Sequence, residues 1–227
     1  MPESPRWARW SRPAPPENMF APLDQQLANV QRWNEEREWG FTQRELAAID
    51  LTPQPHDDPL VTDVLAVYLP ATKSMGSVQR TCHELWTLAA EQQPHSWAWD
   101  HRWPDSPKPV RLLAGNEHEP GVRRVALDLG AHWTPGRYLR PIRVRGADSA
   151  HAEILAAAAH FPDWARAMDG KSVPYIWLSG YQVTIPERSI DIHLPVLAWV
   201  RHRATLSLTA YFADHAHSGF ASPVRLA

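Results

Sequence analysis

The spacing of apolar residues predicts a helix close to the start of the chain. Leu23, Leu27, Val30 and Trp33 follow one another at intervals of four, three and three residues, so they share one helical face. Gly40 is typical of the position just after a helix, where a left-handed backbone is favoured. We therefore expect an amphipathic helix that ends before this glycine.

A second helix start follows directly. Thr42 and Glu45 form a T-x-x-E capping box, in which each side chain can satisfy the backbone N–H of the other residue. Phe41 and Leu46 occupy the positions of a hydrophobic staple across the same turn. The two helices together predict a helical hairpin over residues 22–50.

The rest of the chain contains both strand and helix patterns. Residues 60–69 form an apolar, β-branched run, and residues 122–129 alternate between apolar and charged positions, so each predicts a strand. We expect 122–129 to pair with 110–114 as a hairpin. Further strands are predicted at 140–145, 174–178, 181–185, 192–200 and 204–212, and helices at 77–92, 149–160 and, briefly, 163–168.

This order neither alternates strictly between strands and helices nor separates them. It predicts an α+β fold, with the N-terminal helical hairpin packed on a mixed, largely antiparallel sheet that carries two further helices. Residues 1–18 hold five prolines and almost no aliphatic side chains, which predicts a disordered or extended tail. Residues 19–227 are expected to form a single domain, with the hairpin at 22–50 and the sheet-containing body at 58–227.

Composition adds a surplus of indole rings, since the 227 residues include 12 tryptophans. One group lies on predicted helices and strands and is expected in the core: Trp33, Trp86, Trp164, Trp177 and Trp199. Another group lies in proline-rich segments without periodicity: Trp7, Trp10, Trp97, Trp99 and Trp103. Rings of the second group either dock onto the protein or contact a partner.

Charge and cysteine content limit the classes of protein that fit. The single cysteine, Cys82, excludes an intrachain disulfide, and the net charge of −2 gives no long-range attraction for nucleic acid. The first residues lack the apolar core of a signal peptide, and no apolar run is long enough to span a bilayer. We therefore expect a cytoplasmic protein without a membrane partner.

The strong catalytic motifs are missing from the sequence. It contains no P-loop, no G-x-G-x-x-G, no G-x-S-x-G, no H-E-x-x-H and no paired C-x-x-C. P-loop NTPases, Rossmann oxidoreductases, α/β-hydrolases and zincins are thus unsupported. No cofactor is predicted.

One pair of histidines has the spacing of metal ligands. His215 and His217 share a side of an extended segment and could both ligate a metal, with His193 or His202 as a third ligand. The alternative is a polar loop that follows a strand.

Two surface features have the chemistry of ligand binding. A basic stretch contains Arg137, Arg140, Arg143 and Arg145, which suit phosphates or carboxylates or could pair with the acidic helices of residues 19–63. Trp97 and Trp99 would stack on one side of an extended loop that also holds Trp103. That loop could bind a base, a sugar or a peptide. Alternatively, its rings could pack on the core and hold the loop there.

These observations favour a non-catalytic cytoplasmic binding or accessory protein that acts through protein–protein contacts. The acidic helical hairpin or the Trp-bearing tail would be its docking element. One alternative is a binder of single-stranded nucleic acid or a phosphorylated ligand through residues 137–145 and the Trp97/Trp99 platform. Another is a metal-dependent enzyme that uses His215 and His217.

Overall fold

The computed structural model describes residues 13–93, 96–98, 110–112, 119–131, 151–178, 181–183, 193–212 and 219–226. Its helices are α1 (Leu23–Glu36), α2 (Gln43–Ala47), α3 (Ser77–Glu91), α4 (His151–His160) and α5 (Pro162–Ala167). All five coincide with helices predicted from the sequence. At the start of α2 both halves of the predicted capping box are formed, with Glu45 N–H donating to Thr42 Oγ1 at 3.2 Å and Thr42 N–H to Glu45 Oε2 at 2.7 Å.

The strands form two sheets in place of the single one expected. A three-stranded antiparallel sheet has the order β1 (Val61–Tyr68), β4 (Gly121–Asp128) and β10 (Val224–Arg225). The second sheet runs β2-β8-β7-β5-β9, with β6 also paired to β7 and β3 paired to β6. Its strands are β2 (Ser96–Ala98), β3 (Val110–Leu112), β5 (Tyr175–Trp177), β6 (Tyr181–Val183), β7 (His193–Val200), β8 (Thr205–Phe212) and β9 (Phe220–Ala221). Only β2–β8 and β5–β9 are parallel among these pairs, so the α+β, largely antiparallel expectation is confirmed.

The predicted hairpin between 110–114 and 122–129 is wrong. Strand β4 pairs with β1 along the full length of both, from Val61 opposite Asp128 to Tyr68 opposite Gly121. Strand β3 pairs with β6 in the other sheet. The alternating pattern identified the buried face of β4 correctly, but it carried no information about which strand lies beside β4. The buried strand β1 provides a longer partner than β3 would.

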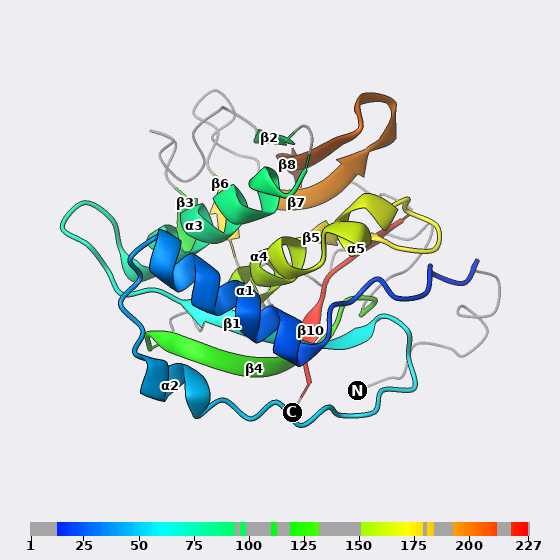
Figure 1. The fold of residues 1–227 in the computed structure, drawn as a ribbon. Helices are drawn as coiled ribbons and strands as arrows, with labels where there is room; N and C mark the ends of the chain where they lie inside the picture. The colour runs from blue at the N-terminus through cyan, green and yellow to red at the C-terminus, as the bar shows by residue number, and fades with distance from the viewer. Residues whose placement is uncertain are drawn as a thin grey trace.

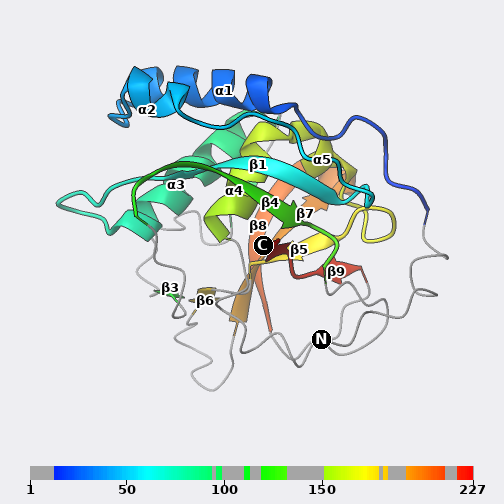
Figure 2. The ribbon, with the colours of Figure 1, turned by 90° about the horizontal axis from the view of Figure 1, so that it is seen from below.

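Figure 1 shows how the elements are arranged in space. Strands β1 and β4 lie at the bottom of the view, α3, α4 and α5 cross the middle, the β7–β8 hairpin lies above, and α1 crosses in front. Figure 2, seen from below, places α1 and α2 on the same side of β1 and β4. One hydrophobic cluster joins α1, β1, α3, α4, α5 and residues of both sheets, so the two sheets share a core.

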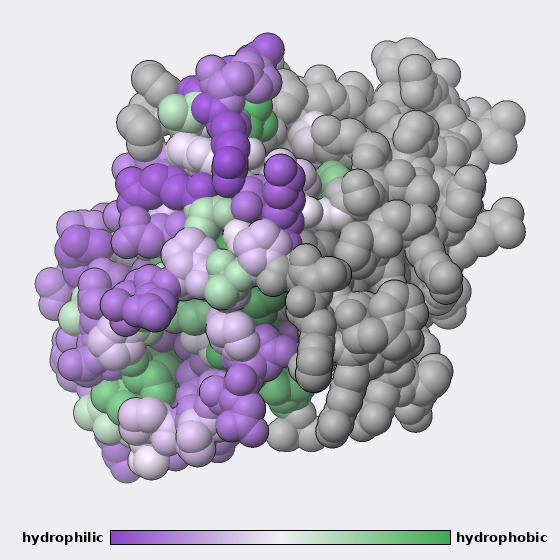
Figure 3. Space-filling view, turned by 90° about the vertical axis from the view of Figure 1, so that its right-hand side faces the viewer, coloured by the Kyte–Doolittle hydropathy of each residue, from purple (hydrophilic) through white to green (hydrophobic). Residues whose placement is uncertain are grey.

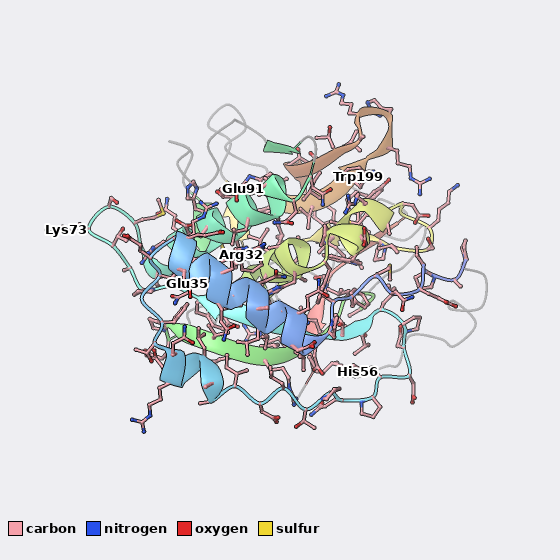
Figure 4. The ribbon with its side chains drawn as sticks, in the orientation of Figure 1. Arg32, Glu35, His56, Lys73, Glu91 and Trp199 are labelled. Carbon is pink, nitrogen blue, oxygen red and sulfur yellow. The ribbon has the colours of Figure 1, made fainter. Side chains whose placement is uncertain are left out.

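The tryptophans expected in the core are found there. Trp33, Trp86, Trp164 and Trp177 are buried, and Trp199 is half-buried and packs against the core. Trp199 lies on β7, just before the hairpin turn to β8 (Figure 4). Trp7 and Trp10 lie outside the described residues, as does most of the predicted N-terminal tail.

An ion pair joins the end of α1 to the end of α3. Arg37, at the C-cap of α1, donates to Glu91 with 2.6 Å between Nη2 and Oε2. The Arg37 side chain is half-buried, and the hydrogen bond to Glu91 raises the pKa of its guanidinium. Figure 4 shows Glu91 at the far end of α3 and Arg32 and Glu35 on the outer side of α1.

Side chains from three helices occupy the open side of β1. Gln26 of α1 is buried, and its Nε2 donates to Asp63 O at 3.0 Å while its Oε1 accepts from Leu65 N–H at 2.8 Å. The amide thus forms the two hydrogen bonds that a neighbouring strand would otherwise provide.

Two further side chains continue this row. Thr81 of α3 accepts the N–H of Leu69 at 2.8 Å, and His160 of α4 lies with Nε2 3.1 Å from Leu65 O. Because a carbonyl only accepts, Nε2 carries the proton and donates. Strand β1 therefore has β4 on one side and a row of side-chain partners on the other.

His160 is held in its neutral form. Its ring is buried against Trp33, with 4.8 Å between ring centroids. Burial lowers the pKa of His160 from 6.5 to about 4, although the hydrogen bond to Leu65 O acts in the opposite direction. The unfolded chain consequently binds more protons than the folded chain between these two values.

Among the described residues, no helix is long and apolar enough to cross a lipid bilayer.

Replacing Gln26 by alanine should lower the free energy of unfolding by about 3 kcal/mol, because Asp63 O and Leu65 N–H lose their buried partner. Urea denaturation measures the change. Gln25→Ala, on the exposed neighbouring position, is the matched control and should stay within about 0.5 kcal/mol of the parent. Equal effects of the two variants would contradict the role of Gln26.

Acidification should destabilise the fold through His160. Its contribution is complete above pH 6.5 and falls by about 3 kcal/mol as the pH drops to about 4, because the buried ring stays neutral. His160→Gln keeps a donor for Leu65 O but does not titrate, so its urea midpoint should depend less steeply on pH in this window. Parallel pH profiles for the two proteins would exclude His160 as the titrating group.

Candidate functional site

The site residues predicted from the sequence fall almost entirely outside the described residues. This holds for Trp99, Trp103, Arg137, Arg140, Arg143, Arg145, His215 and His217. Trp97 lies in the short strand β2, opposite Ser207 of β8, and its side chain is not described. The arginine, tryptophan and histidine sites therefore remain predictions.

A groove lies between α2 and the first half of β4. Figure 1 shows α2 at the lower left, beside this end of β4. Its volume is about 570 Å³, within the range of ordinary ligand sites. Its apolar part is formed by Phe41, Leu46, Ile49 and Val122. Its remaining lining is Glu45, Ala48, Asp50, Gly121, Arg123 and Arg124.

The local sequence holds α2 in place beside β4. Leu46 is buried, and the capping box fixes the first turn of this short helix. The Thr42 backbone and hydroxyl groups donate to Glu45 and lower the pKa of its carboxyl. The Glu45 carboxylate is thus engaged in hydrogen bonds at the N-terminus of its own helix.

The other charges on this side of the groove also have partners. The Thr52 N–H donates to Asp50 Oδ1 at 2.9 Å and lowers the pKa of Asp50. Arg124 Nη1 donates to Thr52 O and lies 3.8 Å from Asp50 Oδ2. The polar rim is therefore pre-organised. The apolar patch is the part of the groove whose burial by a bound group would release the most free energy.

A buried polar cluster lies beneath the other face of β4. Glu153 of α4 is fully buried, and its Oε1 accepts from Tyr68 Oη at 2.6 Å and lies 2.7 Å from Arg225 Nε. Burial, followed by the charge of Glu153, raises the pKa of Tyr68, so this hydroxyl stays protonated. The cluster ties α4 to β1 and to the C-terminal strand β10.

Arg123 links the cluster to the surface. It lies in the groove lining, and its guanidinium carbon is 5.6 Å from the centroid of the Tyr68 ring. Its Nη2 donates to Glu119 O at 3.2 Å, and the residue is exposed. Arg123 is therefore an accessible cation beside the groove.

An imidazole–carboxylate pair lies on the segment that leads from α2 to β1. His56 Nε2 is 3.7 Å from Asp63 Oδ1, and Asp63 is buried. Figure 4 shows His56 below the three-stranded sheet. Such a pair can orient a base, but the described contacts place no nucleophile beside it.

A further carboxylate is enclosed by its own loop. Asp169 Oδ1 accepts the N–H groups of Lys171, Ser172 and Val173 at 2.7–3.0 Å. Burial alone would raise the pKa of Asp169, but these hydrogen bonds together lower it. Asp169 Oδ2 lies 3.4 Å from Arg201, in the exposed turn between β7 and β8. In Figure 3, hydrophilic residues predominate among the coloured residues at the upper left, with a few apolar residues between them.

Metal chemistry receives no support from the described ranges of the chain. They contain no group of three or more His, Cys, Asp or Glu residues placed to hold a metal ion. Cys82, the single cysteine of the chain, is buried.

Sequence reasoning missed both the groove and the cluster beneath it. The only signal for the cluster was a glutamate within the otherwise apolar stretch 152–159. The groove had no signal, because it joins residues 41–50 to residues 121–124 through the pairing of β4 with β1.

Comparisons of this chain with protein-family models, with curated proteins and with solved structures gave no match.

The buried and exposed acid–arginine pairs should differ strongly in their contribution to stability. Glu153→Ala should lower the free energy of unfolding by about 3 kcal/mol, because Arg225 and Tyr68 lose a buried partner. Asp163→Ala removes the exposed Asp163–Arg166 pair and should change it by no more than about 0.5 kcal/mol. Urea denaturation of both variants measures the difference, and similar losses would contradict a structural role for Glu153.

Proposed function

We propose that the chain is a non-catalytic, cytoplasmic accessory protein that binds another protein through the groove between α2 and β4. The observation that carries the proposal is the half-buried apolar patch of Phe41, Ile49 and Val122, which lies over the buried Leu46 inside a groove of about 570 Å³. Apolar surface gains free energy when a partner removes it from water.

The charges around the groove support a protein partner over a small molecule. Glu45 and Asp50 lie on the α2 side, whereas Arg123 and Arg124 lie on β4, and a polar rim around an apolar centre is typical of protein interfaces. The α2 side of the groove belongs to the acidic N-terminal region from which the sequence predicts docking.

Filling the groove should abolish partner binding. Ala48 is exposed and lines the groove, so Ala48→Trp places a large ring in the space that a partner would enter. Ala28 is exposed on α1, away from the groove lining, and Ala28→Trp is the matched control. Affinity purification of the tagged full chain from its own cells, with quantitative mass spectrometry, measures recovery of a stoichiometric partner.

We expect the recovery to fall about tenfold or more with Ala48→Trp and to stay unchanged with Ala28→Trp. A parent chain that recovers no stoichiometric partner, or a partner that Ala48→Trp retains fully, would overturn the proposal.

A further inference from the structure

Among the described residues, nothing pairs with the outer edge of β4 over the half of the strand that lines the groove. Leu129 N–H donates to Leu60 O at 2.9 Å, on the β1 side, and Leu226 N–H donates to Ala126 O at 2.9 Å, on the β10 side. In an antiparallel ladder these directions alternate along the strand. The N–H and C=O groups of Val122 and Arg124 therefore point away from β1, in the same direction as Ala126 O.

No strand of the described part of the chain covers this stretch. Strand β10 pairs with Leu127 and Asp128 and ends there. The N–H and C=O groups of Val122 and Arg124 have no backbone partner within the described residues. Unpaired strand edges are templates for another strand, and proteins otherwise block them.

The groove lies beside this edge. Gly121, Val122, Arg123 and Arg124 all line it, and its apolar patch includes Val122. Side chains of an added strand would alternate between the two faces of the sheet. Every second residue of such a strand would thus enter the groove, where apolar side chains fit.

The opposite face at the same edge carries a positive charge. Arg123 points to the face of the sheet that holds Tyr68, and it is exposed. A carboxylate on the neighbouring position of an added strand would form a cross-strand ion pair with it. The charge therefore favours Asp or Glu between the apolar positions.

We propose that an extended peptide segment of the partner protein adds to β4 as a strand at residues 122–124. It would lie on the same edge of β4 as β10, which pairs only with Leu127 and Asp128. Its apolar side chains enter the groove, and an acidic side chain between them faces Arg123. This inference rests on the proposed function and names its binding mode and the chemistry of the partner segment.

A proline at Val122 separates strand addition from simple groove filling. Val122→Pro removes an N–H that faces the open edge and is not used by β1, a position at which strands tolerate proline. Val122→Ala is the matched control, because it removes the same apolar side chain and keeps the N–H. The probes are peptides selected from a phage-displayed random library on the full-length parent chain, with fluorescence anisotropy as the binding measurement.

We expect Val122→Pro to weaken the selected peptides about tenfold more than Val122→Ala does. Arg123→Glu should weaken peptides that carry an acidic residue between apolar positions. Equal weakening by the proline and alanine variants would overturn strand addition and leave the groove as the binding site. Peptides that bind the Ala48→Trp variant as well as the parent would overturn both proposals.

Amide hydrogen exchange on the parent chain tests the same contact without a substitution. Bound peptide should slow exchange at the Val122 and Arg124 amides and leave the Ala66 amide, which faces β4, unchanged. Unaltered exchange at the first two amides would overturn strand addition even if Val122→Pro failed to fold. A parent chain that sediments as a dimer, and as a monomer after Val122→Pro, would also overturn the proposal, since a second copy would then occupy the edge.

Discussion

Strand β1 is buried over nearly its whole length, and a buried strand must satisfy the polar groups of both its edges. Strand β4 satisfies one edge, and the other lies against helices that have no free backbone groups along their sides. Gln26, Thr81 and His160 supply the missing donors and acceptors from three separate helices. The positions of α1, α3 and α4 around β1 all depend on these hydrogen bonds, because an apolar side chain at any of the three sites would leave a buried polar group unsatisfied.

The outer edges of the two long strands of the three-stranded sheet are covered to different extents. The open side of β1 is filled by the protein's own side chains, and the ion pair of Glu153 with Arg225 fixes β10 against the end of β4. The start of β4 has no comparable cover within the described residues, and it is there that the groove beside α2 lies. One edge of this small sheet, along β1, is therefore buried and hydrogen-bonded. The opposite edge, at the start of β4, is accessible among the described residues.

Local patterns predicted the elements well and their partners poorly. The capping box at Thr42 and the burial of Trp33 and Trp164 follow from short-range spacing, which a sequence displays directly. The pairing of β4 with β1 does not, since alternation defines a buried face and not the neighbouring strand. Gln26 lies on the apolar face of α1, and its hydrogen-bond partners, Asp63 O and Leu65 N–H, lie in a strand whose position no periodicity encodes. The groove depends on that pairing and was hidden for the same reason, whereas the predicted arginine, tryptophan and histidine sites lie outside the described residues.

The connectivity of the three-stranded sheet has a consequence for how the chain folds. Its strands come from residues 61–68, 121–128 and 224–225, so each pairing closes a long loop before it gains any hydrogen bonds. Chains rich in such distant contacts fold slowly, and unpaired apolar strands are prone to aggregate meanwhile. During synthesis β1 leaves the ribosome well before β4, with both of its edges bare. Helix α1 precedes β1 in the chain, so Gln26 is available to bind one of those edges before β4 has been synthesised.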